Sequence, residues 1–171
     1  AFRTIPVLLE LSKEMHEICP NAWLINFTNP AGIVTEALLK HGPHQKVIGV
    51  CNIPFNMRNS TAEVLHVDVK RVSIEFIGLN HFVFGRRVFV DGSDRTEDVM
   101  QRLMSKQLDF SPANIVSLGW SDAFLQAVNM LPNPYHQYYF QTTETLEKDL
   151  AAYNTNGTRA EIVQEVERTL F

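Results

Sequence analysis

The order of apolar and polar positions in the first fifty residues alternates between helix and strand patterns. Apolar residues recur every three or four positions over 5–18, which predicts a helix with one buried face. The almost wholly apolar run 22–27 predicts a buried strand, and 46–50 predicts another. Between them, Asn29 as N-cap and Pro30 at the first helical position predict a second helix. Helices that alternate with buried strands indicate a parallel α/β sheet.

The pattern changes near residues 51–56. After a short helical stretch, the β-rich runs 69–79 and 82–90 predict two long strands, with a turn at Asp91-Gly92 beyond them. From Thr96 onward the pattern is helical, apart from a proline-broken segment at 131–135. An α/β part therefore leads into an α+β part, with a predicted boundary between them.

Composition narrows the class of protein. The chain has 171 residues, of which 45% are hydrophobic and 20% charged, so a packed core is expected rather than disorder. The net charge of −4 argues against nucleic acid or an anionic membrane as a partner. No apolar run is long enough for a transmembrane span, and two cysteines make no disulfide framework. These features predict a cytoplasmic protein.

Both ends of the chain have the pattern of an internal segment. The chain opens Ala1-Phe2-Arg3 without a methionine, and it closes in an amphipathic helical pattern that lacks a stop signal. We therefore expect the chain to be part of a longer protein, truncated at both ends. A cofactor site upstream of residue 1 would then be invisible in this sequence.

Two side chains that can bind a metal ion follow predicted strands. Cys51 comes directly after the strand 46–50, where open parallel sheets bind their ligands, and His81 lies between the two long β runs. Each has an ordinary structural interpretation, Cys51 as a small buried side chain and His81 as a satisfied imidazole. If the fold brings them together, a thiolate and an imidazole make a metal site with open positions.

Three further positions allow two interpretations each. The Asn29 amide either caps a helix or holds a sugar hydroxyl at the edge of the sheet. Tyr135, Tyr138 and Tyr139 form an aromatic cluster that serves either packing or catalysis. Arg159 stands at a predicted helix start, where a cation is poorly placed for the helix dipole, so it is either solvated or binds an anion.

Six short motifs, in their order along the chain, point to a protein family more specifically than any one of them does. They are Arg3-Thr4-Ile5-Pro6, Asn26-Phe27-Thr28-Asn29-Pro30-Ala31-Gly32, Val47-Ile48-Gly49-Val50-Cys51-Asn52-Ile53-Pro54, Gly78-Leu79-Asn80-His81, Pro134-Tyr135-His136-Gln137-Tyr138-Tyr139 and Thr158-Arg159-Ala160-Glu161. In this order and spacing the chain resembles glycoside hydrolase family 4 over essentially its whole length. The chain corresponds to the middle of a longer member of this family.

The resemblance implies a particular fold. Residues 1–52 would be the last part of a dinucleotide-binding domain, the tail end of a Rossmann-type parallel sheet. Residues 53–171 would be part of a catalytic α+β domain similar to the C-terminal domain of lactate dehydrogenase. The glycine-rich loop that binds NAD would lie upstream of this chain, so the cofactor-binding residues are unknown here.

The resemblance also implies an unusual glycosidase chemistry, outside the usual scheme of two carboxylates. In this family NAD⁺ takes a hydride from C3 of the sugar, a tyrosine removes the C2 proton, and a divalent metal, typically Mn²⁺, stabilises the enediolate. The residues carried over are Cys51 and His81 as metal ligands, Tyr135 as the base, and Asn29 and Arg159 as substrate contacts. A chain that lacks the NAD loop is expected to be inactive alone.

The residue after the metal-binding cysteine points to one branch of the family. An aspartate is typical there in phospho-α-glucosidases, whereas this chain has Asn52, as in the 6-phospho-β-glucosidase branch. An amide cannot protonate a leaving group, so that proton would have to come from water or another group. The resemblance makes Asn52 a substrate contact. The expected substrate is a phosphorylated disaccharide or β-glucoside, and the expected assembly is a homo-oligomer. A 2-hydroxyacid dehydrogenase-like oxidoreductase and a non-catalytic oligomerisation module are the alternatives.

Overall fold

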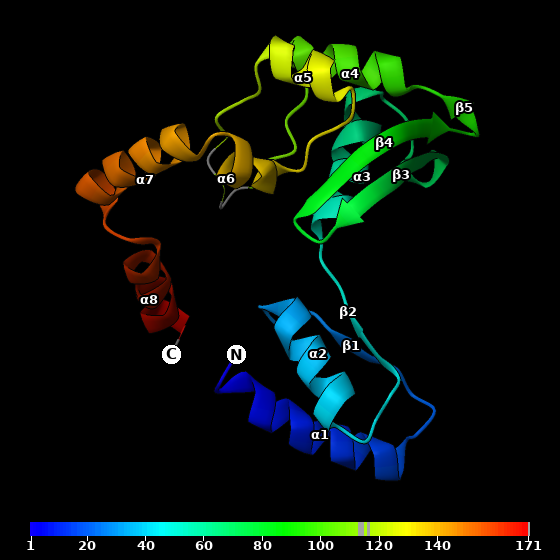
Figure 1. The fold of residues 1–171 in the computed structure, drawn as a ribbon, viewed down its shortest axis with the longest axis vertical. Helices are drawn as coiled ribbons and strands as arrows, with labels where there is room; N and C mark the ends of the chain where they lie inside the picture. Colours follow the sequence, from blue (N-terminus) through cyan, green and yellow to red (C-terminus); the bar gives the residue numbers. More distant parts are fainter. Residues whose placement is uncertain (113–114, 116, 171) are drawn as a thin grey trace. The chain divides into compact units, whose positions relative to one another are not determined.

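The chain folds as two compact units, residues 1–53 and 54–171 (Figure 1). The structure is a computed structural model that describes residues 1–112, 115 and 117–170, without the side chains of Asn156 and Arg159. Which domain of a longer protein each unit belongs to stays a prediction.

The first unit has the predicted alternation of helices and strands. Its elements are α1 (Thr4–Ile18), β1 (Leu24–Asn26), α2 (Ala31–His41) and β2 (Val47–Gly49). The two strands are parallel, with Leu24 opposite Val47. Figure 1 shows α1 alongside α2, and both contribute apolar side chains to one core with the strands. The buried centre of that core is Leu24, Val34, Leu38 and Val47.

The strands of this unit are buried on one face only. Alternate side chains of β1 and β2 point to opposite faces, and the register places Ile25 beside Ile48 on the face away from the core. These two side chains are 64% and 46% exposed. The prediction of a largely buried strand at 22–27 and a buried one at 46–50 is therefore wrong for the outer face, because α1 and α2 pack against the inner one.

The start of α2 also differs from the prediction. The helix begins at Ala31, and Pro30 occupies the N-cap position with an extended ψ of 111° and no side-chain cap. The Asn29–Pro30 peptide bond is cis. Asn29 thus precedes the cap and is exposed, so its predicted role as N-cap is wrong.

The second unit opens with α3 (Ile53–Val64), which starts at the last residue of the first unit, and continues into an antiparallel sheet. A 3₁₀ turn, η1 (Val69–Arg71), leads into β3 (Val72–Leu79), β4 (Phe82–Val90) and β5 (Ser93–Asp94), in the order β3-β4-β5. The predicted turn is present, because Asp91 and Gly92 both have positive φ. The two-residue strand β5 beyond it was not predicted.

The rest of the chain is helical with one interruption. It contains α4 (Thr96–Met104), α5 (Asp122–Val128), η2 (Pro134–His136), α6 (Gln137–Phe140), α7 (Thr142–Asn156) and α8 (Arg159–Leu170). The described residues between 105 and 121 form no helix, so the prediction of a continuous helical pattern is wrong there. Asp109 and Ser117 accept backbone hydrogen bonds from residues two positions ahead, which favours turns.

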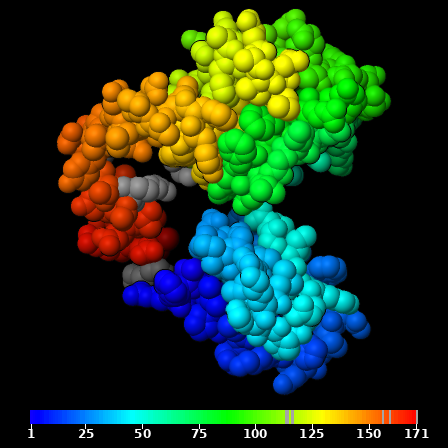
Figure 2. Space-filling model, viewed as in Figure 1, coloured from blue at the N-terminus to red at the C-terminus, as the bar shows by residue number. Residues whose placement is uncertain are grey.

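The core of the second unit lies between the sheet and α4. Val99, Met100 and Leu103 face inward from α4, and Val88 and Val90 face them from β4. In the space-filling view α5 lies directly against α4 (Figure 2). In the part of the chain that the structure describes, no helix has the length and apolar character needed to cross a membrane.

Candidate functional site

In the first unit, a buried amide organises the loop that follows β1. Asn26 is 3% exposed. Its Nδ2 donates to Ala31 O at 3.3 Å and to Thr35 Oγ1 at 3.1 Å, and its Oδ1 accepts from Thr28 N at 3.0 Å. The side chain therefore ties both ends of the loop to α2. Asn29, the predicted substrate contact, projects from this loop into solvent.

The end of β2 lies beside the same network. Val50 N donates to Asn26 O at 3.0 Å, so the chain emerges from the sheet next to the buried amide. A Cβ on Gly49 would lie 2.4 Å from Thr35 Oγ1, which explains why a residue without a side chain stands there. The half-buried Cys51 and the exposed Asn52 follow directly. The first unit thus gathers Asn29, Cys51 and Asn52 on the two loops after its strands.

In the second unit, His81 lies at the tip of the β3–β4 hairpin. Leu79 pairs with Phe82, which leaves Asn80 and His81 as a two-residue loop. His81 has a φ of 62°, in the left-handed region that histidine enters more readily than most residues. Gly78, with a φ of 114°, lies so close to Phe82 that a Cβ would be 2.3 Å from its carbonyl oxygen. The hairpin is thereby closed tightly beneath a half-buried imidazole.

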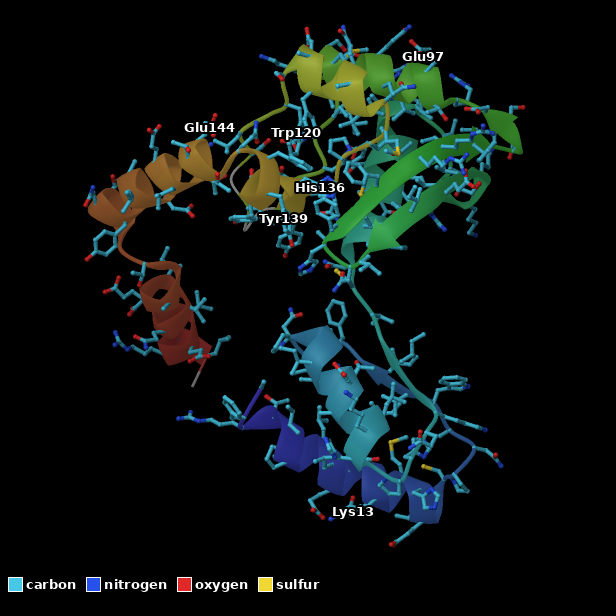
Figure 3. The ribbon with its side chains drawn as sticks, viewed as in Figure 1. Lys13, Glu97, Trp120, His136, Tyr139 and Glu144 are labelled. Carbon is cyan, nitrogen blue, oxygen red and sulfur yellow. The ribbon has the colours of Figure 1, made fainter. Side chains whose placement is uncertain are left out.

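Tyr135 meets this imidazole. The two rings stack, with centroids 4.0 Å apart and planes inclined by 15°. Tyr135 belongs to the 3₁₀ turn η2, where side chains three residues apart share a face, and its ring is 6.2 Å from that of Tyr138. Tyr139, labelled in Figure 3, instead packs against Phe82, with ring centroids 4.9 Å apart. The structure therefore brings together two of the predicted site residues, His81 and Tyr135.

Two residues beside Tyr135 were missed by the sequence analysis. Asn133 and His136 are both completely buried. Asn133 Oδ1 accepts from Tyr135 N at 2.9 Å, and His136 Nδ1 accepts from Asn133 N at 3.2 Å, a reciprocal capping box. Burial lowers the pKa of His136 to about 4, so this imidazole is neutral near pH 7. An asparagine before proline, with a polar residue three positions on, was the available signal.

The remaining predicted contact, Arg159, begins α8, and its side chain lies outside what the structure describes. The turn before it is well defined. Thr158 N and Oγ1 both donate to Glu161 Oε2, and Thr158 Oγ1 accepts from Glu161 N at 3.2 Å. These bonds lower the pKa of the Glu161 carboxyl. The start of α8 is therefore capped by Thr158 and Glu161, independently of Arg159.

The predicted metal ligands belong to different units, Cys51 to the first and His81 to the second. Their pairing stays a prediction. Among the described residues, no three side chains of His, Cys, Asp or Glu gather to form a metal site. Any ion that uses these two donors must therefore complete its coordination with water, substrate or residues outside this set.

Fold and site together define a class of protein. Its α/β unit carries the amides of Asn29 and Asn52 and the thiol of Cys51 after parallel strands, and its α+β unit stacks the His81 imidazole on the Tyr135 phenol. The model of family 4 glycosyl hydrolases matches residues 1–67, and the model of their C-terminal domain matches residues 76–171. The chain belongs to glycosyl hydrolase family 4. This confirms the resemblance and the α/β-to-α+β fold class.

Individual relatives agree with this assignment. A probable 6-phospho-beta-glucosidase of Bacillus subtilis (strain 168) is 51% identical over 169 residues, which are 99% of this chain and 38% of that protein. A 6-phospho-beta-glucosidase of Escherichia coli (strain K12) is 43% identical over 99% of this chain and 38% of its own length. The chain thus spans about 38% of the length of these curated relatives.

A solved structure matches as well. The 6-phospho-beta glucosidase from Thermotoga maritima, in a form with manganese, NAD⁺ and glucose-6-phosphate, superposes with a TM-score of 0.77 at 30% identity. The match covers 98% of this chain and 37% of that one.

Proposed function

We propose that this chain is part of an enzyme that hydrolyses 6-phospho-β-glucosides with the help of NAD⁺ and a divalent metal. The observation that carries the proposal is the stacking of Tyr135 on His81, because it puts a candidate base beside a candidate metal ligand. The names of the relatives and the ligands of the Thermotoga maritima enzyme support it. Membership of a hydrolase family favours this activity over a dehydrogenase or a non-catalytic module.

The donor set fits a transition metal. A thiol at Cys51 and an imidazole at His81 are both ligands of such ions, although a thiolate is soft for Mn²⁺. Both side chains are half-buried, so they are partly desolvated and still accessible. When bound, the metal would supply positive charge beside the sugar oxygens, and NAD⁺ would supply the oxidising power at C3. The dinucleotide would contact residues upstream of this chain.

The residues of this chain then have distinct tasks. Once its own proton has passed to solvent, the Tyr135 phenolate oxygen takes the proton from C2 of the oxidised sugar, and the stacked His81 ring fixes the plane in which that oxygen lies. Asn29 and Asn52, both exposed at the ends of the parallel strands, donate and accept hydrogen bonds to sugar hydroxyls. Arg159 holds an anionic part of the substrate. Asn52 in place of an acid favours the β-glucoside branch.

We also propose a homo-oligomer in the cytoplasm, where phosphorylated sugars are metabolised.

The test is isotope exchange during turnover. The full-length enzyme with NAD⁺, Mn²⁺ and a 6-phospho-β-glucoside in D₂O should release glucose-6-phosphate carrying deuterium at C2. The 6-phospho-α-glucoside should react far more slowly. Hydrolysis without deuterium at C2 would contradict the role of Tyr135 as a base, and faster cleavage of the α-anomer would contradict the branch assignment.

A further inference from the structure

The segment that carries Tyr135 is anchored to the strand that carries His81. Gly85 N donates to Leu131 O at 2.9 Å, and Leu131 N donates to Gly85 O at 2.8 Å, so residue 131 pairs with the middle of β4. A Cβ on Gly85 would lie 3.1 Å from Leu131 Cβ and from Ile74 Cγ2, tighter than ordinary contact. The close approach of the two backbones therefore depends on a glycine in β4.

From this anchor, a capping box sets the path of the backbone through Tyr135. Asn133 Oδ1 accepts from Tyr135 N at 2.9 Å, and His136 N donates to Asn133 O at 2.9 Å. His136 Nδ1 accepts from Asn133 N at 3.2 Å, which places the proton of the neutral ring on Nε2. Each of the three bonds begins or ends on Asn133, so this residue fixes the backbone on both sides of Tyr135.

The same turn packs against the hairpin tip in register. Tyr135 stacks on His81, and the next residue, His136, packs against the next residue of the hairpin, Phe82, with ring centroids 5.1 Å apart. His136 also packs against Phe84 at 4.1 Å. Two consecutive residues of η2 thus meet two consecutive residues of the β3–β4 hairpin, Tyr135 on His81 and His136 on Phe82.

The box carries a cost in stability. Asn133 Nδ2 and His136 Nε2 are buried donors with no hydrogen-bond partner among the described residues. An unsatisfied buried donor destabilises a protein, and apolar side chains of similar volume would avoid the penalty. Both of these polar side chains are completely buried, and both stand within two residues of the candidate base.

We propose that Asn133 and His136 are positioning residues, which hold the Tyr135 ring against His81 so that its hydroxyl faces the sugar. The proposal rests on the role of Tyr135 given above. Both side chains are completely buried, so we expect them to act through the Tyr135 backbone and the hairpin and not by touching the substrate. Loss of the Asn133 Oδ1 or the His136 Nδ1 acceptor should displace the Tyr135 hydroxyl slightly. Such a displacement lowers the rate of the chemical step and leaves sugar binding nearly unchanged.

Matched variants separate the acceptor from the packing. Asn133→Ala removes the acceptor for Tyr135 N, whereas Asn133→Ser keeps a cap-competent oxygen. His136→Phe keeps the ring and removes the Nδ1 acceptor, whereas His136→Gln keeps an acceptor of the kind usual at this position of a capping box. Two readouts are needed: kcat and KM of the enzyme, and the ring-current shift of the His81 Cε1 proton in histidine-labelled protein.

The deletion variants should lower kcat by roughly 10- to 100-fold with KM changed little, and they should move the His81 resonance. Asn133→Ser and His136→Gln should restore most of both. Unchanged kcat and resonance in a folded deletion variant overturn the proposal, as does a loss of kcat that the conservative variant does not restore. If both deletion variants fail to fold while His136→Gln is fully active, the pair serves stability alone, and the proposal is also wrong.

Failure of the proposed function gives a different result. If Tyr135→Phe keeps normal exchange at C2, then Tyr135 is not the base. The His81 resonance still reports whether Asn133 and His136 hold the stacked pair, because ring current does not depend on the hydroxyl.

Discussion

The two units hold their candidate site residues by different physical means. In the first unit, the loop before α2 is fixed by hydrogen bonds from one buried amide, Asn26, and the residue that would touch substrate, Asn29, stands free of that network in solvent. In the second unit, Tyr135 is itself part of the packing, stacked on His81 and followed by the buried His136. In the first unit, the residue that fixes the loop and the residue proposed to bind substrate are different residues. In the second unit, the residues that pack the site adjoin the proposed base.

This difference predicts different responses to mutation. In the first unit, stability and substrate contact should be separable by changing Asn26 or Asn29. In the second unit, substitutions around Tyr135 should change both stability and catalytic rate. The exception is a substitution that removes only the hydroxyl and keeps the ring.

The largest effect should come from such a change, Tyr135→Phe. It keeps the ring on His81 and removes the hydroxyl, so kcat of the full-length enzyme should fall about 10²- to 10⁴-fold, the usual cost of losing a general base. Exchange of the C2 hydrogen should fall in parallel. Tyr138→Phe and Tyr139→Phe are the matched controls. If one of them abolishes exchange while Tyr135→Phe keeps it, the base is misassigned within the cluster.

The next effect concerns pH. The pKa of His136 is about 4 in the folded protein and near 6.5 when unfolded, so the folded state resists its protonation. The contribution is fully present above pH 6.5, falls as the pH drops, and is lost below about pH 4. The free energy of unfolding should therefore decrease by roughly 3 kcal/mol over this window because of His136 alone.

Urea unfolding of the wild-type chain and of His136→Phe between pH 7 and pH 4 measures this. Carboxyls such as Asp98, whose pKa is lowered by hydrogen bonds from Arg102 and Arg95, weaken in acid in both proteins. The difference between the two curves isolates the histidine. Parallel curves would show that His136 is not protonated on unfolding in the way its burial implies.

A smaller effect is expected in the first unit. Asn26→Ala removes hydrogen bonds to Ala31 O and Thr35 Oγ1 from a buried site, and the free energy of unfolding should drop by about 2 kcal/mol. Asn29→Ala changes an exposed side chain, so stability should stay within ~0.5 kcal/mol while sugar binding weakens. Denaturation and equilibrium binding of glucose-6-phosphate measure the two. Equal destabilisation by both variants would contradict the separation of support from contact.

The smallest effect is an expected gain. Gly32 lies in the first turn of α2, and apart from its chain neighbours and the adjacent helix backbone no described atom lies within 4 Å of the place that an alanine methyl would take. Gly32→Ala should therefore stabilise the protein by about 0.5–1 kcal/mol through the lower entropy of the unfolded chain. Gly85→Ala should destabilise the protein instead, because a Cβ there would lie 3.1 Å from atoms of Leu131 and Ile74. Thermal unfolding compares them. A stabilising Gly85→Ala would mean that the anchor of the Tyr135 segment is looser than the structure indicates.

Local patterns were sufficient for most of the elements. The helix at Thr4–Ile18 and the alternation that follows it are confirmed, because an apolar stripe at helical spacing can be buried in only one way. The turn at Asp91-Gly92 is confirmed, because its two positive φ values suit these residue types. The helix start at Asn29 was wrong by one residue, because the first helical hydrogen bond runs from Val34 N to Pro30 O, which makes Pro30 the N-cap. The prediction of helix between 105 and 121 was wrong for the residues that the structure describes there, because the turns at Asp109 and Ser117 depend on single side-chain acceptors.

The sequence by itself determined the family, the order of most elements and most of the types of side chain at the site, because these follow from motifs and from spacing along the chain. Only the tertiary structure decided that His81 and Tyr135, 54 positions apart, stack on each other, and that Asn133 and His136 in the same turn as Tyr135 are buried. Those contacts depend on the pairing of Leu131 with Gly85 across the sheet. Packing between distant segments is set by the shape of the whole core, which no local pattern records.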